Sequence, residues 1–274
     1  MPLQVRKLSD ALGAEILGLD LKVELDAETI HTIQNTLHED LLLVLRNQKI
    51  EPLHHMNFCK LFGEIQGQRI GQDIESTEFP GLMFVGNTRE DAMLQNGEMW
   101  FHSDQCYLEK PNSLTSLHAE IVPANGGNTR FANCQLAYEK LDPAIKDIIK
   151  SLKGINFYDY ASANEQKKVI EWGPDTKFFA HPLVRIHPHS GRKSLYLNRL
   201  MTDQIENFDE TNGGILLNQL FDHIEREDFI YEHPWKPYDL AIWDNRCVIH
   251  ARTDFDSREE RLLRRFCVVG ETPS

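Results

Sequence analysis

Short strand-like runs dominate the chain after residue 100, and no other feature of the sequence restricts the fold as strongly. Apolar, β-branched and aromatic residues gather in runs of strand length at 100–107, 114–122, 128–131, 239–243, 248–251 and 262–269. Helical periodicity is clearest in the first third, where Asp26 is a suitable N-cap and Ile30, Ile33 and Leu37 share one face. We therefore expect a mainly β fold, a β-sandwich or jelly roll, with flanking helices outside the sheets.

Local signals predict three further helices and one hairpin. The helices are expected from Pro52 to a stop at Gly63, from Asp142 to a stop at Gly154, and around the apolar positions Ile215, Leu220, Phe221 and Ile224. The hairpin is expected where two β-rich runs flank the turn residues 188–191.

The composition predicts one acidic domain, residues 1–274, without a membrane segment. Hydrophobic residues make up 41% of the 274 positions, and no repeat or linker divides the chain. The net charge of -13 argues against nucleic acid or an anionic membrane as a partner. Five scattered cysteines and an N-terminus unlike a signal peptide favour the cytoplasm. A small-molecule substrate is the expected partner, and homo-oligomers stay open.

The tripeptide His102-Ser103-Asp104 is the main candidate for metal binding. Fe(II) that activates O2 is held by two imidazoles and one carboxylate, which leave three positions open. A His-x-Asp on a strand could supply two of these ligands, because residues i and i+2 point to the same side. A third ligand must then come from a distant strand.

One other His-x-Asp and two His-x-Glu tripeptides occur in the chain. His38-Glu39-Asp40 and His223-Ile224-Glu225 fall on predicted helices, where residues i and i+2 lie about 200° apart around the axis. They are therefore poor metal sites. His118-Ala119-Glu120 falls on a predicted strand and stays as the competing site.

The C-terminal part supplies a histidine and two aligned arginines. A buried strand from Trp243 leads to His250, and Arg261 and Arg265 follow. On an extended strand these arginines face one side with Leu263 between them, whereas Arg264 faces the other. Arginine makes paired hydrogen bonds to carboxylates, so the pair fits an anion site. A solvated strand edge is the alternative.

At this point the chain resembles the taurine dioxygenase (TauD/TfdA) family of Fe(II)- and 2-oxoglutarate-dependent dioxygenases. The resemblance extends over nearly the whole length and rests on 13–16, 18–21, 58–63, 100–104, 122–123, 126–129, 243–246, His250 and the Arg261/Arg265 pair. It implies a double-stranded β-helix (jelly-roll) core and an enzyme that uses Fe(II), 2-oxoglutarate and O2.

The resemblance also implies roles for single residues. His102, Asp104 and His250 would be the iron ligands, and Thr129 and Arg261 would hold the distal carboxylate of 2-oxoglutarate. The implied reaction oxidises a small organic substrate, by default through hydroxylation, and releases succinate and CO2. The carboxylate of Asp104 favours hydroxylation or desaturation over halogenation.

The chain departs from taurine dioxygenase beside the site. Phe101 stands between Trp100 and the first histidine, and Glu98 replaces an asparagine of taurine dioxygenase, which argues against taurine as substrate. We expect a small organic anion held by Arg265. The alternative is an internal salt bridge from Arg265 to a protein carboxylate, for which Glu98 is a candidate. The polar segments 66–97 and 161–175 are candidates for covering the site.

Two other functional classes stay open. A zinc hydrolase could use the same three ligands, because three protein ligands and a water also form a catalytic zinc site. It would give no role to Thr129 and Arg261, and the sequence offers no placed general base. A non-catalytic jelly-roll binding protein is the second alternative.

Overall fold

The computed structural model describes residues 3–67, 79–94, 97–158, 173 and 176–274. The polar segment 66–97, which we expect to cover the site, therefore lies partly outside the described residues, and only residue 173 of the segment 161–175 is described. In the part of the chain that is described, no helix combines the length and apolar character that crossing a membrane requires.

A seven-stranded sheet forms the base of the fold. Its strands run in the spatial order β1-β2-β3-β14-β6-β16-β4, and only β2 and β3 pair in parallel. Their bounds are β1 Gln4–Lys7, β2 Ala14–Leu17, β3 Leu42–Leu45, β14 Leu240–Asp244, β6 Leu114–Ile121, β16 Leu262–Val268 and β4 Met83–Gly86. The first and last parts of the chain thus share one sheet.

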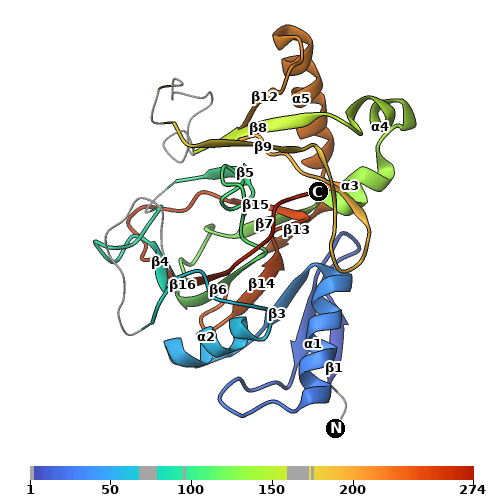
Figure 1. The fold of residues 1–274 in the computed structure, drawn as a ribbon. Coiled ribbons are helices and arrows are strands. Elements are labelled where there is room, and N and C mark those ends of the chain that lie inside the picture. Colours follow the sequence, from blue (N-terminus) through green and yellow to red (C-terminus); the bar gives the residue numbers. More distant parts are fainter. Residues whose placement is uncertain (1–2, 68–78, 95–96, 159–172, 174–175) are drawn as a thin grey trace.

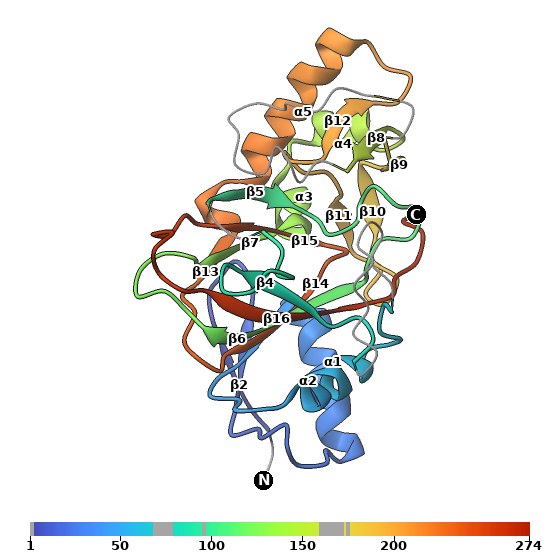
Figure 2. The ribbon, with the colours of Figure 1, turned by 90° about the vertical axis from the view of Figure 1, so that its left-hand side faces the viewer.

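A four-stranded sheet lies above it, as Figure 2 shows for β5, β7 and β15 over β4, β6 and β16. Its order is β13-β7-β15-β5, all antiparallel, with bounds β13 Ile230–His233, β7 Thr129–Asn133, β15 Val248–Arg252 and β5 Met99–His102. Side chains of both sheets, among them Phe131, Trp243 and Leu263, pack into one buried cluster between them. These facing sheets form the expected jelly-roll core.

Two smaller sheets complete the strand content. The three-stranded sheet β12-β8-β9 consists of β12 Thr202–Ile205, β8 Lys153–Phe157 and β9 Phe178–Pro182. The other is the hairpin of β10 Val184–Ile186 and β11 Lys193–Leu195. The hairpin prediction around residues 188–191 is confirmed.

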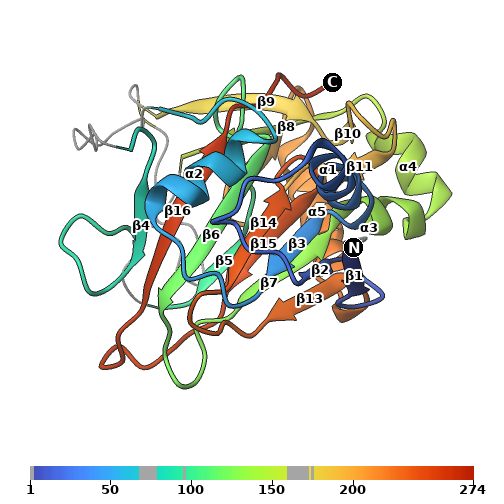
Figure 3. The ribbon, with the colours of Figure 1, turned by 90° about the horizontal axis from the view of Figure 1, so that it is seen from below.

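Helices cover the outer faces of the two main sheets. Their bounds are α1 Ala27–Asp40, α2 Pro52–Lys60, α3 Cys134–Lys140, α4 Pro143–Ile149, α5 Glu210–Ile224 and the short 3₁₀ helix Glu227–Phe229. Figure 3 shows α1 and α2 in front of the seven-stranded sheet, and Figure 1 shows α5 and α4 at the opposite end of the molecule. The predicted N-caps hold, because Asp26 accepts from Thr29 N and Asp142 accepts from Ala144 N.

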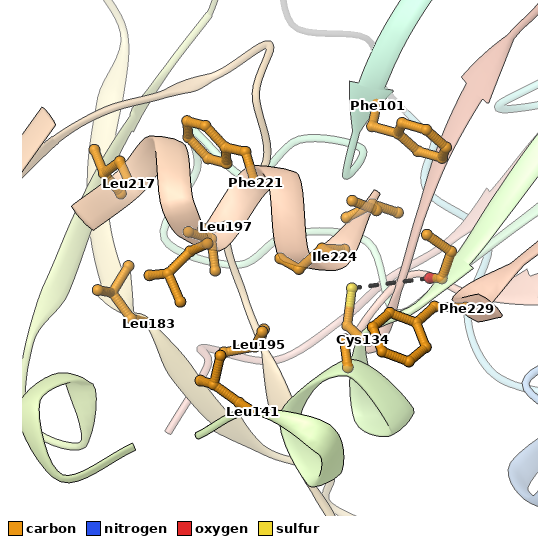
Figure 4. Packing of buried hydrophobic residues seen from close by; sticks show 14 of the residues in the cluster. Phe101, Cys134, Leu141, Leu183, Leu195, Leu197, Leu217, Phe221, Ile224 and Phe229 are labelled. Carbon is orange, nitrogen blue, oxygen red and sulfur yellow. Dashed lines mark hydrogen bonds between the residues drawn. The ribbon is translucent and has the colours of Figure 1, made fainter. Parts of the chain in front are cut away.

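A second core joins α5 to the four-stranded sheet. Leu217, Phe221 and Ile224 of α5 pack with Phe101 of β5 and Cys134 of α3 (Figure 4). These apolar contacts fix the outer face of the strands whose inner face carries the site described below.

Two local predictions need correction, and one helix was not predicted. Ile215 of α5 is 63% exposed, because it lies on the solvent side of the helix. Gly154 lies inside β8, since the preceding helix already ends at Ile149. Helix α3 was not expected, and it follows β7 directly with Asn133 as its N-cap.

Candidate metal and co-substrate site

The structure brings His102, Asp104 and His250 together between the two main sheets. His102 ends β5, and His250 lies opposite it on the neighbouring strand β15. All three side chains are buried, and their ligand atoms lie within 4.8 Å of one another. Two imidazoles and one carboxylate in a single group are the ligand types of a non-haem Fe(II) site.

The strand expected at 100–107 ends already at His102, so Asp104 lies in the turn that follows. Asn245 fixes this turn, because its Oδ1 accepts from Asp104 N and its Nδ2 donates to Asp104 O. The same Oδ1 accepts from Ser103 Oγ. Asn245 belongs to the motif at 243–246, but no role was predicted for its side chain.

The imidazole of His102 is oriented by the backbone. Its Nδ1 lies 2.9 Å from the carbonyl oxygen of Trp100. A carbonyl only accepts, so Nδ1 carries the proton and the Nε2 lone pair faces the site. Burial lowers the pKa of both His102 and His250, which favours the neutral rings that metal binding requires.

Asp104 is held as a carboxylate inside the protein. Thr115 Oγ1 donates to its Oδ2 at 2.6 Å, and Arg265 Nη2 lies 2.5 Å from the same oxygen. Burial alone would raise the pKa of Asp104. The positive charge of Arg265, together with His250, His102 and the hydrogen bond from Thr115, outweighs this effect and holds that pKa well below its usual range.

The second oxygen of this carboxylate provides a test of whether a cation fits. Asp104 Oδ1 is buried, and within the described part of the chain it has no hydrogen-bond partner. A buried ionised oxygen without a partner is costly. A divalent cation shared with His102 and His250 would satisfy it, so the donor set fits Fe(II).

Thr129 and Arg261 line the same cavity. Trp235 Nε1 donates to Thr129 Oγ1 at 3.0 Å, so the threonine hydroxyl keeps its own proton for another acceptor. Arg261 is 2% exposed and donates from Nε and Nη2 to Gly127 O, while its Nη1 has no partner among the residues that are described. Burial lowers the pKa of Arg261 to about 9, and the charge of Arg252 contributes.

The alternation predicted for Arg261, Arg264 and Arg265 is present. Arg261 and Arg265 reach the cavity, whereas Arg264 turns away and donates to Ile50 O and His118 Nδ1. Arg265 forms an ion pair with Asp104 at 2.5 Å, so the internal salt bridge expected as the alternative for this arginine is present, with Asp104 in the place of Glu98.

The competing tripeptide lies on the other face of the seven-stranded sheet from the cavity. His118 Nε2 lies 2.7 Å from Gln48 O, and its Nδ1 accepts from Arg264. Glu120 pairs with Arg264 at 2.8 Å. Both ring nitrogens of His118 are therefore occupied.

A second buried group of suitable residues is His187, Asp244 and Cys247. Asp244 already accepts from Arg246 Nε at 2.8 Å and lies 2.9 Å from His187 Nε2. The adjacent guanidinium neutralises this carboxylate, so the group is an internal ion-pair network.

Comparisons with known proteins agree with this geometry. The profile of the family described as "Taurine catabolism dioxygenase TauD, TfdA family" matches residues 4–267. The (S)-phenoxypropionate/alpha-ketoglutarate-dioxygenase of Sphingobium herbicidovorans is 29% identical over 98% of this chain and 96% of its own length. The alpha-ketoglutarate-dependent sulfate ester dioxygenase of Pseudomonas putida is 29% identical over 100% and 91%. The solved structure of AAD-2 in complex with Mn(II) and N-oxalylglycine is 28% identical, with a TM-score of 0.82 over 99% of both chains.

Proposed function

Because the chain belongs to the taurine catabolism dioxygenase TauD, TfdA family and is an Fe(II)- and 2-oxoglutarate-dependent dioxygenase, we propose that His102, Asp104 and His250 hold its iron. When bound, Fe(II) supplies the oxidising chemistry, with O2 and 2-oxoglutarate (alpha-ketoglutarate) as co-substrates and succinate and CO2 as products. Asp104 stays ionised through Arg265 and Thr115. The rings of Trp243 and Phe131 pack beside His250 and limit the access of water.

Arg261 and Thr129 receive the distal carboxylate of 2-oxoglutarate. The Nη1 of Arg261 and the hydroxyl proton of Thr129 are the donors available for this anion. A buried guanidinium stabilises a buried carboxylate through charge-assisted hydrogen bonds. Leu117, Val85 and Trp243 form apolar walls around the same cavity, which suit the methylene groups of the co-substrate.

The substrate is a small organic anion, which the enzyme hydroxylates. Arg252, Arg261 and Arg265 line the cavity, and the described lining contains no aspartate or glutamate. The sulfate ester and the phenoxypropionate in the names of the two relatives are both organic anions. Arg265 pairs with the proposed metal ligand Asp104, so its guanidinium lies beside the place where such an anion would react.

One observation carries this function: among the described residues, Asp104 Oδ1 lacks a hydrogen-bond partner beside the imidazoles of His102 and His250. These imidazoles line the same cavity as Arg261, whose Nη1 also lacks a partner there. The test is anaerobic addition of Fe(II) and then 2-oxoglutarate to the purified protein. We expect a visible metal-to-ligand charge-transfer band. A zinc hydrolase or a non-catalytic binding protein would give none.

The remaining proposals concern organisation. Residues 1–274 form a single dioxygenase domain, which the pairing of β3 with β14 across nearly 200 residues supports. We also propose that the protein is cytoplasmic and that its partner is a small-molecule substrate, with no nucleic acid or membrane involved. Homo-oligomers are compatible with this proposal.

A further inference from the structure

Arg252 is a buried arginine beside the metal ligands. It ends β15, two residues after His250, so both side chains point to the same face of the strand. It lies opposite Met99 of β5 and is 7% exposed. Burial lowers the pKa of Arg252 to about 10, and the charge of Asp254 partly opposes this.

The guanidinium of Arg252 binds backbone carbonyls that precede β5. Its Nε and Nη2 lie 3.0 and 2.7 Å from Gly97 O, and its Nη1 lies 2.5 Å from Leu94 O. A rigid planar fork can hold two carbonyls at fixed positions, which a lysine ammonium on a flexible stem cannot do as well.

The two residues that Arg252 binds have left-handed backbone conformations. Gly97 has φ of 87°, which glycine adopts readily, but Leu94 has φ of 53°, which is uncommon for a bulky side chain. Such a conformation persists only where the surroundings impose it. The hydrogen bond from Arg252 to Leu94 O is one such constraint.

The side chains of Leu94 and Met99, on either side of Gly97, form a wall of the cavity. Leu94 and Met99 line it together with His102, His250 and Arg252. The carbonyls that Arg252 binds therefore belong to the chain that forms this wall and then leads into the first metal ligand.

We propose that Arg252 is a positioning residue: its fork on Leu94 O and Gly97 O sets the cavity wall of Leu94 and Met99 against the metal site. This inference rests on the proposed function for its meaning in catalysis. Arg252 shapes the space for the organic substrate, whereas the carboxylate of 2-oxoglutarate is held by Arg261.

The first experiment is amide hydrogen exchange on metal-free protein, which does not depend on activity. We expect Arg252→Met to speed exchange in peptides covering 97–102 by about tenfold and to leave β14 unchanged. Arg258→Met is the matched control, because Arg258 pairs with Asp256 on the surface. Unchanged exchange at 97–102, or a uniform rise across the protein, overturns the proposal. If Arg252→Met does not fold, the same exchange measurement is made on Arg252→Lys, and the same outcomes support or overturn the proposal.

A second background tests the strained leucine directly. Asparagine tolerates the left-handed conformation, so in Leu94→Asn the backbone at position 94 should depend less on the hydrogen bond from Arg252. We expect Arg252→Met to speed exchange at 97–102 by a smaller factor in the Leu94→Asn background than in the natural sequence. An equal factor in both backgrounds contradicts the role of Arg252 in holding Leu94.

The charge-transfer band separates this inference from the proposed function. In Arg252→Met, we expect the affinity for 2-oxoglutarate to stay within about threefold of the natural protein. A loss as large as that of Arg261→Met would make Arg252 a co-substrate ligand and overturn the positioning role. Absence of the band in the natural protein would refute the proposed function, while the exchange experiment still decides on Arg252.

Discussion

Asn245 holds Asp104 at both of its backbone groups: Asn245 Oδ1 lies 2.9 Å from Asp104 N, and Asn245 Nδ2 lies 3.0 Å from Asp104 O. The two residues are 141 positions apart. In the turn after β5, the Asn245 side chain thus bonds the backbone N–H and C=O of Asp104, as a neighbouring strand would do. The position of the proposed carboxylate ligand therefore depends on one buried amide.

We predict that Asn245→Ala weakens Fe(II) binding about 10- to 100-fold, the usual effect of losing a residue that orients a metal ligand. The dissociation constant can be measured by anaerobic titration. Asn218→Ala, on the exposed side of α5, is the control and should leave binding unchanged. Equal affinities in Asn245→Ala and the natural protein would show that the turn holds its shape without the amide.

We predict that alanine at His102, Asp104 or His250 abolishes turnover of 2-oxoglutarate while the protein stays folded. Three ligands are the minimum for this geometry. Succinate formation and circular dichroism measure the two properties. Full turnover in His102→Ala would move the metal to another site, and loss of turnover in a folded His118→Ala would point to the competing tripeptide.

For Arg261→Ala, we predict an affinity for 2-oxoglutarate about 100-fold weaker, because an unpaired buried carboxylate costs a few kcal/mol. Arg264→Ala is the matched comparison on the other face of β16. It should destabilise folding by about 1–3 kcal/mol through lost contacts with Ile50 and His118, yet keep the affinity. A larger affinity loss in Arg264→Ala would contradict the assigned roles.

The strand part of this arrangement could be predicted from sequence, since alternation along an extended chain fixes which arginines share a face. The N-caps Asp26 and Asp142 were predictable for a similar reason, because capping depends on neighbours three positions away at most. Helix α3 was missed because it follows β7 with no glycine or proline between them, and its N-cap Asn133 belongs to the strand.

The contacts of Asp104 could not be predicted from local sequence. Its partners Thr115, Asn245 and Arg265 come from three other parts of the chain. Their convergence depends on how β6 pairs with β14 and β16, and no periodicity within one segment contains that information. The resemblance supplied the ligand set, but the interactions that orient it required the structure.

A pH-dependent stability follows from His118. Burial lowers the pKa of His118 to about 4, and protonation of its Nδ1 would bring an N–H against the Arg264 guanidinium. The unfolded chain takes up the proton near pH 6.5, so stability is fully present above that pH and falls as the pH decreases toward 4. We expect a contribution of about 2 kcal/mol to be lost between pH 7 and pH 5.

Urea unfolding at these two pH values measures this loss. In His118→Gln the difference between pH 7 and pH 5 should shrink, because the titrating group is gone. The control His31→Gln, on the exposed side of α1, should keep the full difference. The same pH difference in His118→Gln as in the natural protein would exclude His118 as a cause.

The last prediction concerns the charge of the substrate. Arg265 already pairs with Asp104, so a substrate anion has to share this guanidinium with a metal ligand. Sharing is favourable once a divalent cation also binds the carboxylate, because Asp104 then offers less negative charge to Arg265. We therefore expect alkyl sulfates, phenoxyacetates and similar anions to stimulate succinate formation, whereas neutral analogues of equal size should not.

Arg265→Gln separates the two partners of this side chain. It keeps hydrogen-bond donors for Asp104 but removes the positive charge. A bound divalent cation itself keeps the Asp104 carboxylate ionised, so we expect iron to bind with little change. The KM for the active anion should rise about tenfold or more, since a charged hydrogen bond contributes about 1.5–3 kcal/mol. The KM for 2-oxoglutarate should change much less, because Arg261 holds its carboxylate. Stimulation by neutral compounds alone, with kinetics that Arg265→Gln leaves unchanged, would show that the substrate is not recognised through its charge.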